Sequence, residues 1–187
     1  MQAHPTGLPG VFVVEPQVFG DARGFFFESF NQRKLEAALG RPLGFVQDNQ
    51  SRSARGVLRG LHYQLPQPQG KLVRVTTGEV FDVAVDLRRG SPTCGRWLGE
   101  LLSAENKKQL WIPEGFAHGF LVLSPEAEFL YKTTAYYAPA QERCIRWDDP
   151  ALAIAWPSVG APPQVSTKDA AGLALGEAPL FDMGDAR

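Results

Sequence analysis

The sequence predicts an all-β fold, a sandwich or barrel of short strands, for which a double-stranded jelly roll is the natural candidate. Three observations predict it. Short apolar runs with a period of two recur along the chain, and turn residues are frequent, with 19 Gly and 15 Pro. Helical periodicity is confined to one substantial segment, without strand–helix alternation or internal repeats. The open mouth of such a barrel commonly holds a small-molecule site.

Length and composition indicate one globular domain. The chain has 187 residues, of which 44% are hydrophobic and 21% charged, enough to enclose a sizeable core. We expect residues 1–187 to form a single jelly-roll domain, with a less regular, Pro-rich segment from about residue 139. The 19 Lys and Arg against 20 Asp and Glu give a net charge of −1. This balance lacks the basic excess of nucleic-acid and anionic-membrane binders.

The chain start and the cysteines predict a cytoplasmic protein. The first residues, MQAHPTGLPG, lack the charged and apolar regions of a signal peptide, and no apolar run approaches transmembrane length. Cys94 and Cys144 make no CxxC motif, so we expect each to be a buried free thiol, as in a reducing compartment. A soluble cytoplasmic protein follows.

The first two strands are predicted around a turn. The run Val11–Val14 is β-branched and lies between Gly and Pro, which indicates a strand. Residues Gly20–Gly24 are typical of a turn. The aromatic run Phe25–Phe30 then indicates a second strand, with Arg23 and Glu28 as its polar members. These two either contact a ligand or form a solvated ion pair on an edge strand.

Two helical segments are predicted. Asn31 can cap a helix that continues to Leu39, with one apolar face, and Gly40 supplies the left-handed stop. We expect this helix to have only a packing role. Near the C-terminus, Ser166–Asp169 predicts a capped helical turn, in which the Ser side chain accepts from the Asp169 amide.

Strands fill the middle of the chain. The polar run Phe45–Ser53 would place Gln47 and Asn49 on one side, where their amides either meet a sugar or nucleobase or face water. The runs Lys71–Thr76 and Val80–Leu87 alternate on either side of Gly78 and predict a hairpin. Further strands are predicted at residues 95–102, 109–112, 118–123 and 128–137.

The segment from Gly56 to Lys71, GVLRGLHYQLPQPQGK, concentrates groups capable of chemistry. His62 follows a Gly within an apolar run, with the cations of Arg59 and Lys71 on either side. Three histidines occur in the chain, at positions 4, 62 and 118, and His4 is expected in a loose N-terminus. No HxH or HxxxH pair exists, so a metal site is not predicted.

Proton transfer next to a carbonyl needs the residue types found here. The base should titrate near neutrality, as His does, and a carboxylate should hold its tautomer. A cation must meet the developing enolate oxygen, and a second acid must return the proton on the other face. His62, Asp169, Lys71 and Tyr131 can fill these roles. The alternative is that His62 is a satisfied core residue.

Long runs of the sequence resemble one enzyme family. They are DARGFFFESF, QDNQSRSARGVLRGLHYQ, QGKLVRVTTGEVFDVAVDLRRGSPT, LSAENKKQLWIPEGFAHGFLVLS, EFLYKTTAYY, RWDDP and STKD, in order from about residue 11 to residue 170. The chain is similar to the dTDP-4-dehydrorhamnose 3,5-epimerases. The resemblance implies a cupin-type β jelly roll with a few short peripheral helices, a homodimer with exchanged N-terminal strands, and no metal or other cofactor. It also implies conversion of dTDP-4-dehydro-6-deoxy-D-glucose to dTDP-4-dehydro-L-rhamnose, a step toward dTDP-L-rhamnose for cell-surface polysaccharide.

The resemblance also implies roles for individual residues. His62 is the proton acceptor with Asp169 as its partner, Tyr131 is the proton donor, and Lys71 is expected at the C4 oxygen. The expected substrate contacts are Arg23 and Glu28 (from the neighbouring subunit), Gln47, Asp48, Asn49, Arg59, Lys71, His118, Tyr137 (stacked on thymine), Glu142 and Lys168. Cys94 and Cys144 depart from the family pattern, which has Phe and Gly there, and place local packing in question.

Three other functions compete with this one. The first is an epimerase acting at one carbon, or a ketoisomerase, on a related dTDP-4-keto-6-deoxy sugar. The second is a metal-dependent cupin oxygenase, which the missing HxH pair argues against. The third is a non-catalytic sugar-nucleotide-binding module, which would not need His62, Lys71, Tyr131 and Asp169 together.

Overall fold

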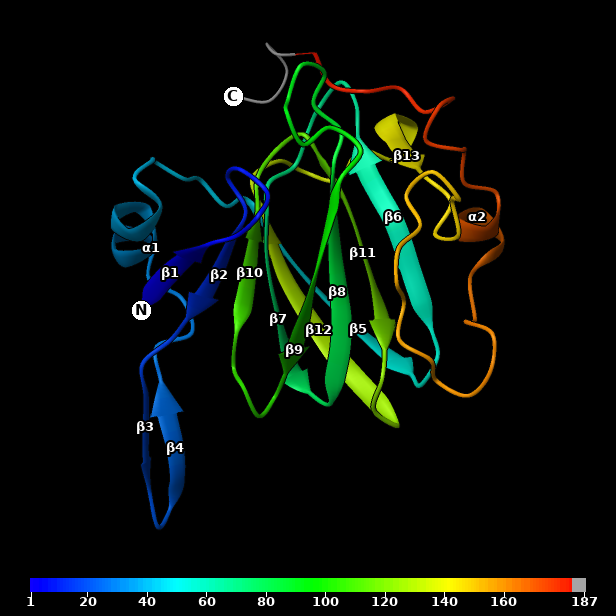
Figure 1. Cartoon of the computed structure of the whole chain (residues 1–187). Helices are drawn as coiled ribbons and strands as arrows, with labels where there is room; N and C mark the ends of the chain where they lie inside the picture. The colour runs from blue at the N-terminus through cyan, green and yellow to red at the C-terminus, as the bar shows by residue number, and fades with distance from the viewer. Residues whose placement is uncertain (183–187) are drawn as a thin grey trace.

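A computed structural model of the chain describes residues 1–182 and consists mainly of two antiparallel sheets packed face to face (Figure 1). The six-stranded sheet has the order β1 (Gln2–Pro5), β2 (Phe12–Glu15), β10 (Gln109–Ile112), β7 (Lys71–Thr77), β12 (Glu126–Thr133) and β5 (Gln47–Ala54). The five-stranded sheet has the order β13 (Glu142–Cys144), β6 (Leu58–Gln64), β11 (Phe116–Val122), β8 (Glu79–Asp86) and β9 (Trp97–Ser103). The predicted all-β jelly roll is confirmed.

The main core lies between the two sheets. Val73 and Phe129 reach it from the six-stranded sheet, and Ala84 and Phe120 from the five-stranded sheet. A second core covers the outer face of the five-stranded sheet, where the segment after residue 139 packs with residues such as Phe181. Strand β8 contributes side chains to both cores. Both of its faces therefore carry apolar residues, as expected for a strand that is buried on both sides.

Both predicted helical segments are confirmed. Helix α1 (Gln32–Leu39) has Asn31 as its N-cap, whose side chain accepts from the Lys34 amide, and Gly40 ends it with a φ of 69°. Helix α2 (Thr167–Ala170) has Ser166 as its N-cap, and the hydroxyl accepts from the amide of Asp169. The cap fixes the position of Asp169 beside strand β6.

The hairpin predicted around Gly78 is wrong. Strand β7 pairs with β10 and β12, whereas β8 pairs with β11 and β9, so the chain crosses from one sheet to the other at Gly78. Gly78 has a φ of +75°, and a Cβ there would lie 2.0 Å from the carbonyl oxygen of Glu126. A period of two identifies a strand but not its partner, and this tight crossing looks like a hairpin turn in sequence.

The N-terminal region differs from prediction in two ways. It is not loose, because β1 pairs with β2 and His4 lies opposite Val13. The aromatic strand is shorter than predicted: β4 (Gly24–Phe27) pairs only with β3 (Val18–Asp21). This β3–β4 hairpin, here called the arm, projects away from the two sheets (Figure 1).

Two glycines let β6 and β11 approach closely at the cavity. A Cβ on Gly60 would lie 2.6 Å from the Cα of Gly119 and 2.8 Å from the carbonyl oxygen of His118. Gly60 also has a φ of +124°, which favours glycine. The two glycines thereby bring together the strands that carry Arg59, His62 and His118.

Both cysteines are free, as predicted, but Cys94 is exposed. It lies in a surface turn after β8, where its amide donates to the carbonyl of Ser91. Cys144 is partly buried at the end of β13. No helix within residues 1–182 has both the length and the apolar character needed to cross a membrane.

Candidate active site

A cavity of about 360 Å³ opens between the two sheets. The six-stranded sheet provides one wall, with side chains from β5, β7 and β12, and the five-stranded sheet provides the other, with side chains from β6 and β11. It is lined by Gln47, Asn49, Gln50, Ser51, Arg59, His62, Gln69, Lys71, His118, Gly119, Phe120, Phe129, Tyr131, Tyr137 and Glu142. Nine of the residues predicted from the sequence therefore meet in one place.

His62 is paired with Asp169. The Nε2 atom of His62 lies 2.5 Å from Oδ1 of Asp169, which is 3% exposed. Burial alone would raise the pKa of Asp169, but its hydrogen bonds with His62 and Ser166 outweigh this and lower it. Asp169 is therefore a carboxylate that can only accept, so Nε2 of His62 carries the proton and Nδ1 keeps its lone pair. The pair prepares His62 to act as a base.

Lys71 is a buried amine beside His62. It begins β7 and is 8% exposed, with Nζ donating to the backbone carbonyl of His62 over 3.5 Å. Burial lowers the pKa of Lys71 to about 8, against the opposing charges of Asp82 and Glu142. The amine remains mostly protonated at neutral pH. A poorly solvated cation of this kind interacts strongly with negative charge that develops next to it.

His118 has a buried partner that the sequence interpretation missed. Its Nε2 lies 2.9 Å from Oδ2 of Asp82, and both side chains are almost fully buried. Burial lowers the pKa of His118, and the adjacent Asp82 offsets only part of that effect. The other oxygen, Asp82 Oδ1, has no hydrogen-bond partner within residues 1–182. In the alternation of β8, Asp82 shares one face with Val80 and Ala84, so a carboxylate between apolar residues was the available signal.

Tyr131 faces the cavity from the opposite sheet. It lies in β12 against Phe129, with their ring centroids 6.1 Å apart. Burial raises the pKa of Tyr131, and the negative charge of Glu142 adds to this, so the phenol stays protonated. One sheet wall thus carries the imidazole of His62, and the other carries a phenol that can donate a proton.

A polar cluster borders the cavity at its outer edge. The hydroxyl of Tyr137 donates to Oε2 of Glu142 over 2.6 Å, and the same oxygen accepts from Lys168. Burial alone would raise the pKa of Glu142, but these two hydrogen bonds lower it. The amide of Tyr137 donates to Gln47, which in turn donates to Asn49 over 2.9 Å. The Tyr137 ring is half exposed and available for stacking.

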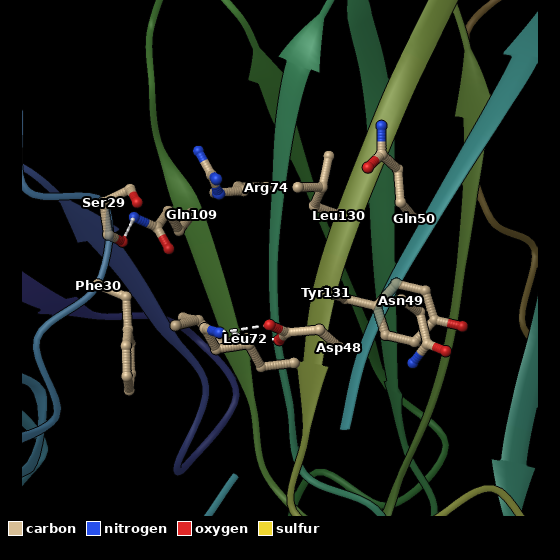
Figure 2. Close-up of a pocket in the computed structure, with 11 residues that line it drawn as sticks. Ser29, Phe30, Asp48, Asn49, Gln50, Leu72, Arg74, Gln109, Leu130 and Tyr131 are labelled. Atoms are coloured by element: carbon tan, nitrogen blue, oxygen red, sulfur yellow. Dashed lines mark hydrogen bonds and ion pairs between the residues drawn. The ribbon is translucent and has the colours of Figure 1, made fainter. Parts of the chain in front are cut away.

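Three predicted residues lie elsewhere. Asp48 is on the outer face of β5, where its carboxylate accepts from Lys132 over 2.8 Å; Figure 2 shows this second pocket, of about 400 Å³. Arg23 lies at the tip of the arm, paired with Asp21 at 2.6 Å. Glu28 follows the arm and pairs with Lys34. Successive residues of a strand face opposite sides of the sheet, so the side chain of Asp48 points away from those of Gln47 and Asn49.

The arrangement supports proton transfer without further groups. An imidazole with a free nitrogen, a buried ammonium and a protonated phenol share one cavity, and the imidazole and the phenol come from opposite sheets. Within residues 1–182, the side chains of His62, Cys144 and Asp169 also lie close enough to one another to hold a metal ion. An ion held by these side chains would occupy the imidazole of His62, so His62 could not transfer a proton at the same time.

Comparison with known proteins identifies relatives across almost the whole chain. A sequence model of the dTDP-4-dehydrorhamnose 3,5-epimerase family matches residues 5–177. A dTDP-4-dehydrorhamnose 3,5-epimerase from Pseudomonas aeruginosa is 66% identical over 181 residues, which cover 97% of this chain and 99% of that protein.

Two solved structures have the same fold. The dTDP-6-deoxy-D-glucose-3,5-epimerase of Legionella pneumophila, in complex with dTDP-4-keto-L-rhamnose, is 56% identical with a TM-score of 0.92, covering 95% of this chain and 94% of that one. A 3′-monoepimerase from Streptomyces bikiniensis, in complex with dTDP-quinovose, is 36% identical with a TM-score of 0.87, covering 92% and 87%. The match over residues 5–177 and the identity to full-length relatives assign this chain to the dTDP-4-dehydrorhamnose 3,5-epimerase family.

Proposed function

We propose that the protein is a dTDP-4-dehydrorhamnose 3,5-epimerase, an isomerase that converts dTDP-4-dehydro-6-deoxy-D-glucose to dTDP-4-dehydro-L-rhamnose in dTDP-L-rhamnose biosynthesis. The observation that carries this proposal is the cavity in which the His62–Asp169 pair faces Tyr131, with Lys71 beside the base. These are the three functions that inversion next to a ketone requires.

His62 acts as the single base. The hydrogens on C3 and C5 of the substrate are axial on one face of the ring, and both carbons flank the C4 ketone. The free Nδ1 of His62 can therefore remove either proton in turn. Asp169 stabilises the imidazolium that forms, as a buried carboxylate does for a catalytic His.

Lys71 stabilises the enolate. When a proton leaves C3 or C5, negative charge moves to the C4 oxygen, and the buried ammonium meets it there. Because the ammonium is largely desolvated before the reaction, it needs little reorganisation when the charge develops. Removing one such donor typically costs about 2.7–4 kcal/mol.

Tyr131 returns the proton from the other side. Its pKa is raised, which keeps the phenol protonated at neutral pH. A proton delivered from the six-stranded sheet to a carbon that lost its proton toward the five-stranded sheet inverts that carbon. Solvent then reprotonates Tyr131 and His62 transfers its proton to solvent, so no cofactor is consumed.

The remaining polar residues bind the dTDP-sugar. We assign Arg59 and His118 to the diphosphate and sugar, and the exposed ring of Tyr137 to stacking on thymine. Gln47 and Asn49 supply amides for sugar hydroxyls, and Glu142 and Lys168 supply further contacts at the edge of the cavity. Asp48 is left out of these contacts, since its side chain pairs with Lys132 on the outer face of β5.

The protein acts as a homodimer in which the two chains exchange their arms. Each chain forms a single domain, and the enzyme is cytoplasmic. Phe19, Phe25 and Phe26 of the arm are 56%, 63% and 71% exposed in the isolated chain. Aromatic exposure on this scale indicates an interface. Exchange of the arm, together with the residue that follows it, would carry Arg23 and Glu28 to the partner's cavity. Light scattering should give the mass of a dimer at micromolar concentration; a fully active monomer would contradict this.

A single-centre epimerase is the second candidate, because the Streptomyces bikiniensis relative is a 3′-monoepimerase. NMR of the dTDP-4-keto sugar incubated with the enzyme in D₂O distinguishes the two. The proposed function requires deuterium and inversion at both C3 and C5. Deuterium and inversion at one carbon only would identify a single-centre epimerase, and no deuterium at either would leave only a binding module.

A further inference from the structure

Cys144 lies directly beside the His62–Asp169 pair. Strand β13 runs antiparallel to β6, and Cys144 is opposite His62 in that pairing. The ligand atoms of His62, Asp169 and Cys144 all lie within 4.8 Å of one another. The three side chains come from three different elements, β6, α2 and β13, and converge on one point.

We propose that His62, Asp169 and Cys144 bind a thiophilic divalent cation, with Zn²⁺ as the best match, and that the bound ion inhibits the enzyme by occupying its base. Three protein ligands of the N, O and S types, with water in the fourth position, are the donor set of open tetrahedral zinc sites. The inhibition rests on the proposed function, whereas the binding does not.

The geometry needs only side-chain adjustment. Zinc bonds of about 2.0–2.3 Å to N, O and S place two ligand atoms of a tetrahedral site about 3.3–3.8 Å apart. The present separations, up to 4.8 Å, exceed this by about one ångström. The His62–Asp169 hydrogen bond, at 2.5 Å, must open by a similar amount, and the proton on Nε2 must move to Nδ1. Backbone pairing between β6 and β13 already fixes the His62 and Cys144 positions.

The local charge favours a cation. Burial, followed by the negative charges of Asp169 and Glu142, raises the pKa of the Cys144 thiol to about 12, against the opposing charge of Lys168. His62 is the titratable group of β6 that pairs with Cys144, and the charge of the thiolate also acts on Tyr63. The carboxylates that hold the thiol protonated also attract a divalent ion, and Lys168 is partly neutralised by its pairing with Glu142.

The site is accessible from solvent. The His62 side chain is 28% exposed. A further pocket of about 450 Å³, separate from the one in Figure 2, is lined by His62 and Asp169 together with Ser166 and Lys168. An ion can therefore reach the pair without local unfolding. Binding replaces the thiol proton, so the apparent affinity for zinc should rise with pH.

The test is calorimetric titration of the full chain with buffered Zn²⁺, comparing wild type with Cys144→Ser and Cys94→Ser. The second variant removes the other free thiol, which is exposed and distant in sequence from the pair. We expect one zinc ion per wild-type chain, unchanged affinity in Cys94→Ser, and affinity reduced about tenfold or more in Cys144→Ser. With Co²⁺, wild type and Cys94→Ser should give a thiolate-to-metal charge-transfer band that Cys144→Ser lacks.

Turnover supplies a separate readout. Zinc should inhibit wild type and Cys94→Ser, a chelator should restore activity, and Cys144→Ser should resist the same concentration. Zinc affinity equal in wild type and Cys144→Ser, or a Co²⁺ complex without a thiolate band in wild type, would overturn the metal site. An inactive metal-free wild type that still binds zinc through Cys144 would contradict the proposed function and leave the site intact.

Discussion

The two nitrogens of His62 have different environments, and the difference defines its role. Nε2 is engaged by the carboxylate of Asp169 at 2.5 Å, which leaves Nδ1 available to take a proton. His118 is held similarly by Asp82, but both of those side chains are almost fully buried and the pKa of His118 is lowered by burial. Of the two, His62 is the more accessible imidazole, with 28% of its side chain exposed against 8% for His118.

Replacing Asp169 by Asn tests the control of the His62 tautomer. An amide can present a donor to Nε2, which would leave the other nitrogen protonated and unable to accept. We expect kcat to fall by about 10²- to 10⁴-fold, with substrate affinity little changed. Steady-state kinetics and calorimetric binding of dTDP check this. Turnover within a few-fold of wild type would show that Asp169 does not orient the base.

Lys71 predicts an alkaline limit to activity. Its pKa is lowered to about 8 by burial, so the ammonium loses its proton as pH rises through that value. Since only the charged form stabilises the enolate, kcat/KM should fall above about pH 8, by roughly tenfold for each further unit. A pH profile of kcat/KM reports this group in the free enzyme.

A matched variant assigns that limit to Lys71. In Lys71→Arg the guanidinium stays charged throughout the accessible pH range. The variant should have a lower kcat/KM, because the planar guanidinium differs in shape from the ammonium. Its pH profile of kcat/KM should nevertheless lack the fall near pH 8. An unchanged alkaline limb in Lys71→Arg would assign the limb to another group.

Among the strands, the contact between β6 and β11 is the most demanding for the site. In Gly60→Ala, the new methyl group would meet backbone atoms of His118 and Gly119 at 2.8 and 2.6 Å, and the residue would keep a φ of +124°. We expect a loss of about 2–4 kcal/mol of unfolding free energy, measured by denaturant titration, and reduced activity.

Gly160→Ala provides the control for that variant. Gly160 also has a positive φ, +85°, but a Cβ there would meet no atom within 4 Å. We expect Gly160→Ala to lose about 1–2 kcal/mol of unfolding free energy, from the backbone conformation alone, with activity unchanged. Equal losses in the two variants would show that the close approach of the strands contributes nothing beyond backbone strain.

The elements that local signals define were predicted well. Helix α1 has the cap and the stop expected from Asn31 and Gly40, and α2 has the expected Ser166 cap, since capping involves neighbours in sequence. Strand partners were not predictable from the same information. A hairpin turn and the crossing at Gly78 have the same local sequence pattern. The strand partners, in contrast, depend on residues about 30 to 60 positions away.

On the scale of the whole molecule, the site forms because two sheets close on each other. His62 and Tyr131 are far apart in sequence and belong to different sheets, so their convergence was inferred from family resemblance and not from spacing. Asp82 and Cys144 were missed as neighbours of the site, because their positions follow from strand pairing. Arg23 in the arm and Glu28 directly after it do not line the cavity of the same chain, and the arm projects away from the two sheets, which is the strongest structural argument for exchange between subunits.

The central claim is that one base and one acid act from opposite sheets. Exchange of substrate hydrogen in D₂O, followed by NMR for His62→Ala and Tyr131→Phe, tests it most directly. His62→Ala should incorporate no deuterium at C3 or C5, because no enolate forms. Tyr131→Phe keeps His62 and Lys71, so deuterium should still enter at one or both carbons while inversion fails at one carbon at least. If Tyr131→Phe instead gives the doubly inverted product at the wild-type rate, Tyr131 is not the acid and the claim is contradicted.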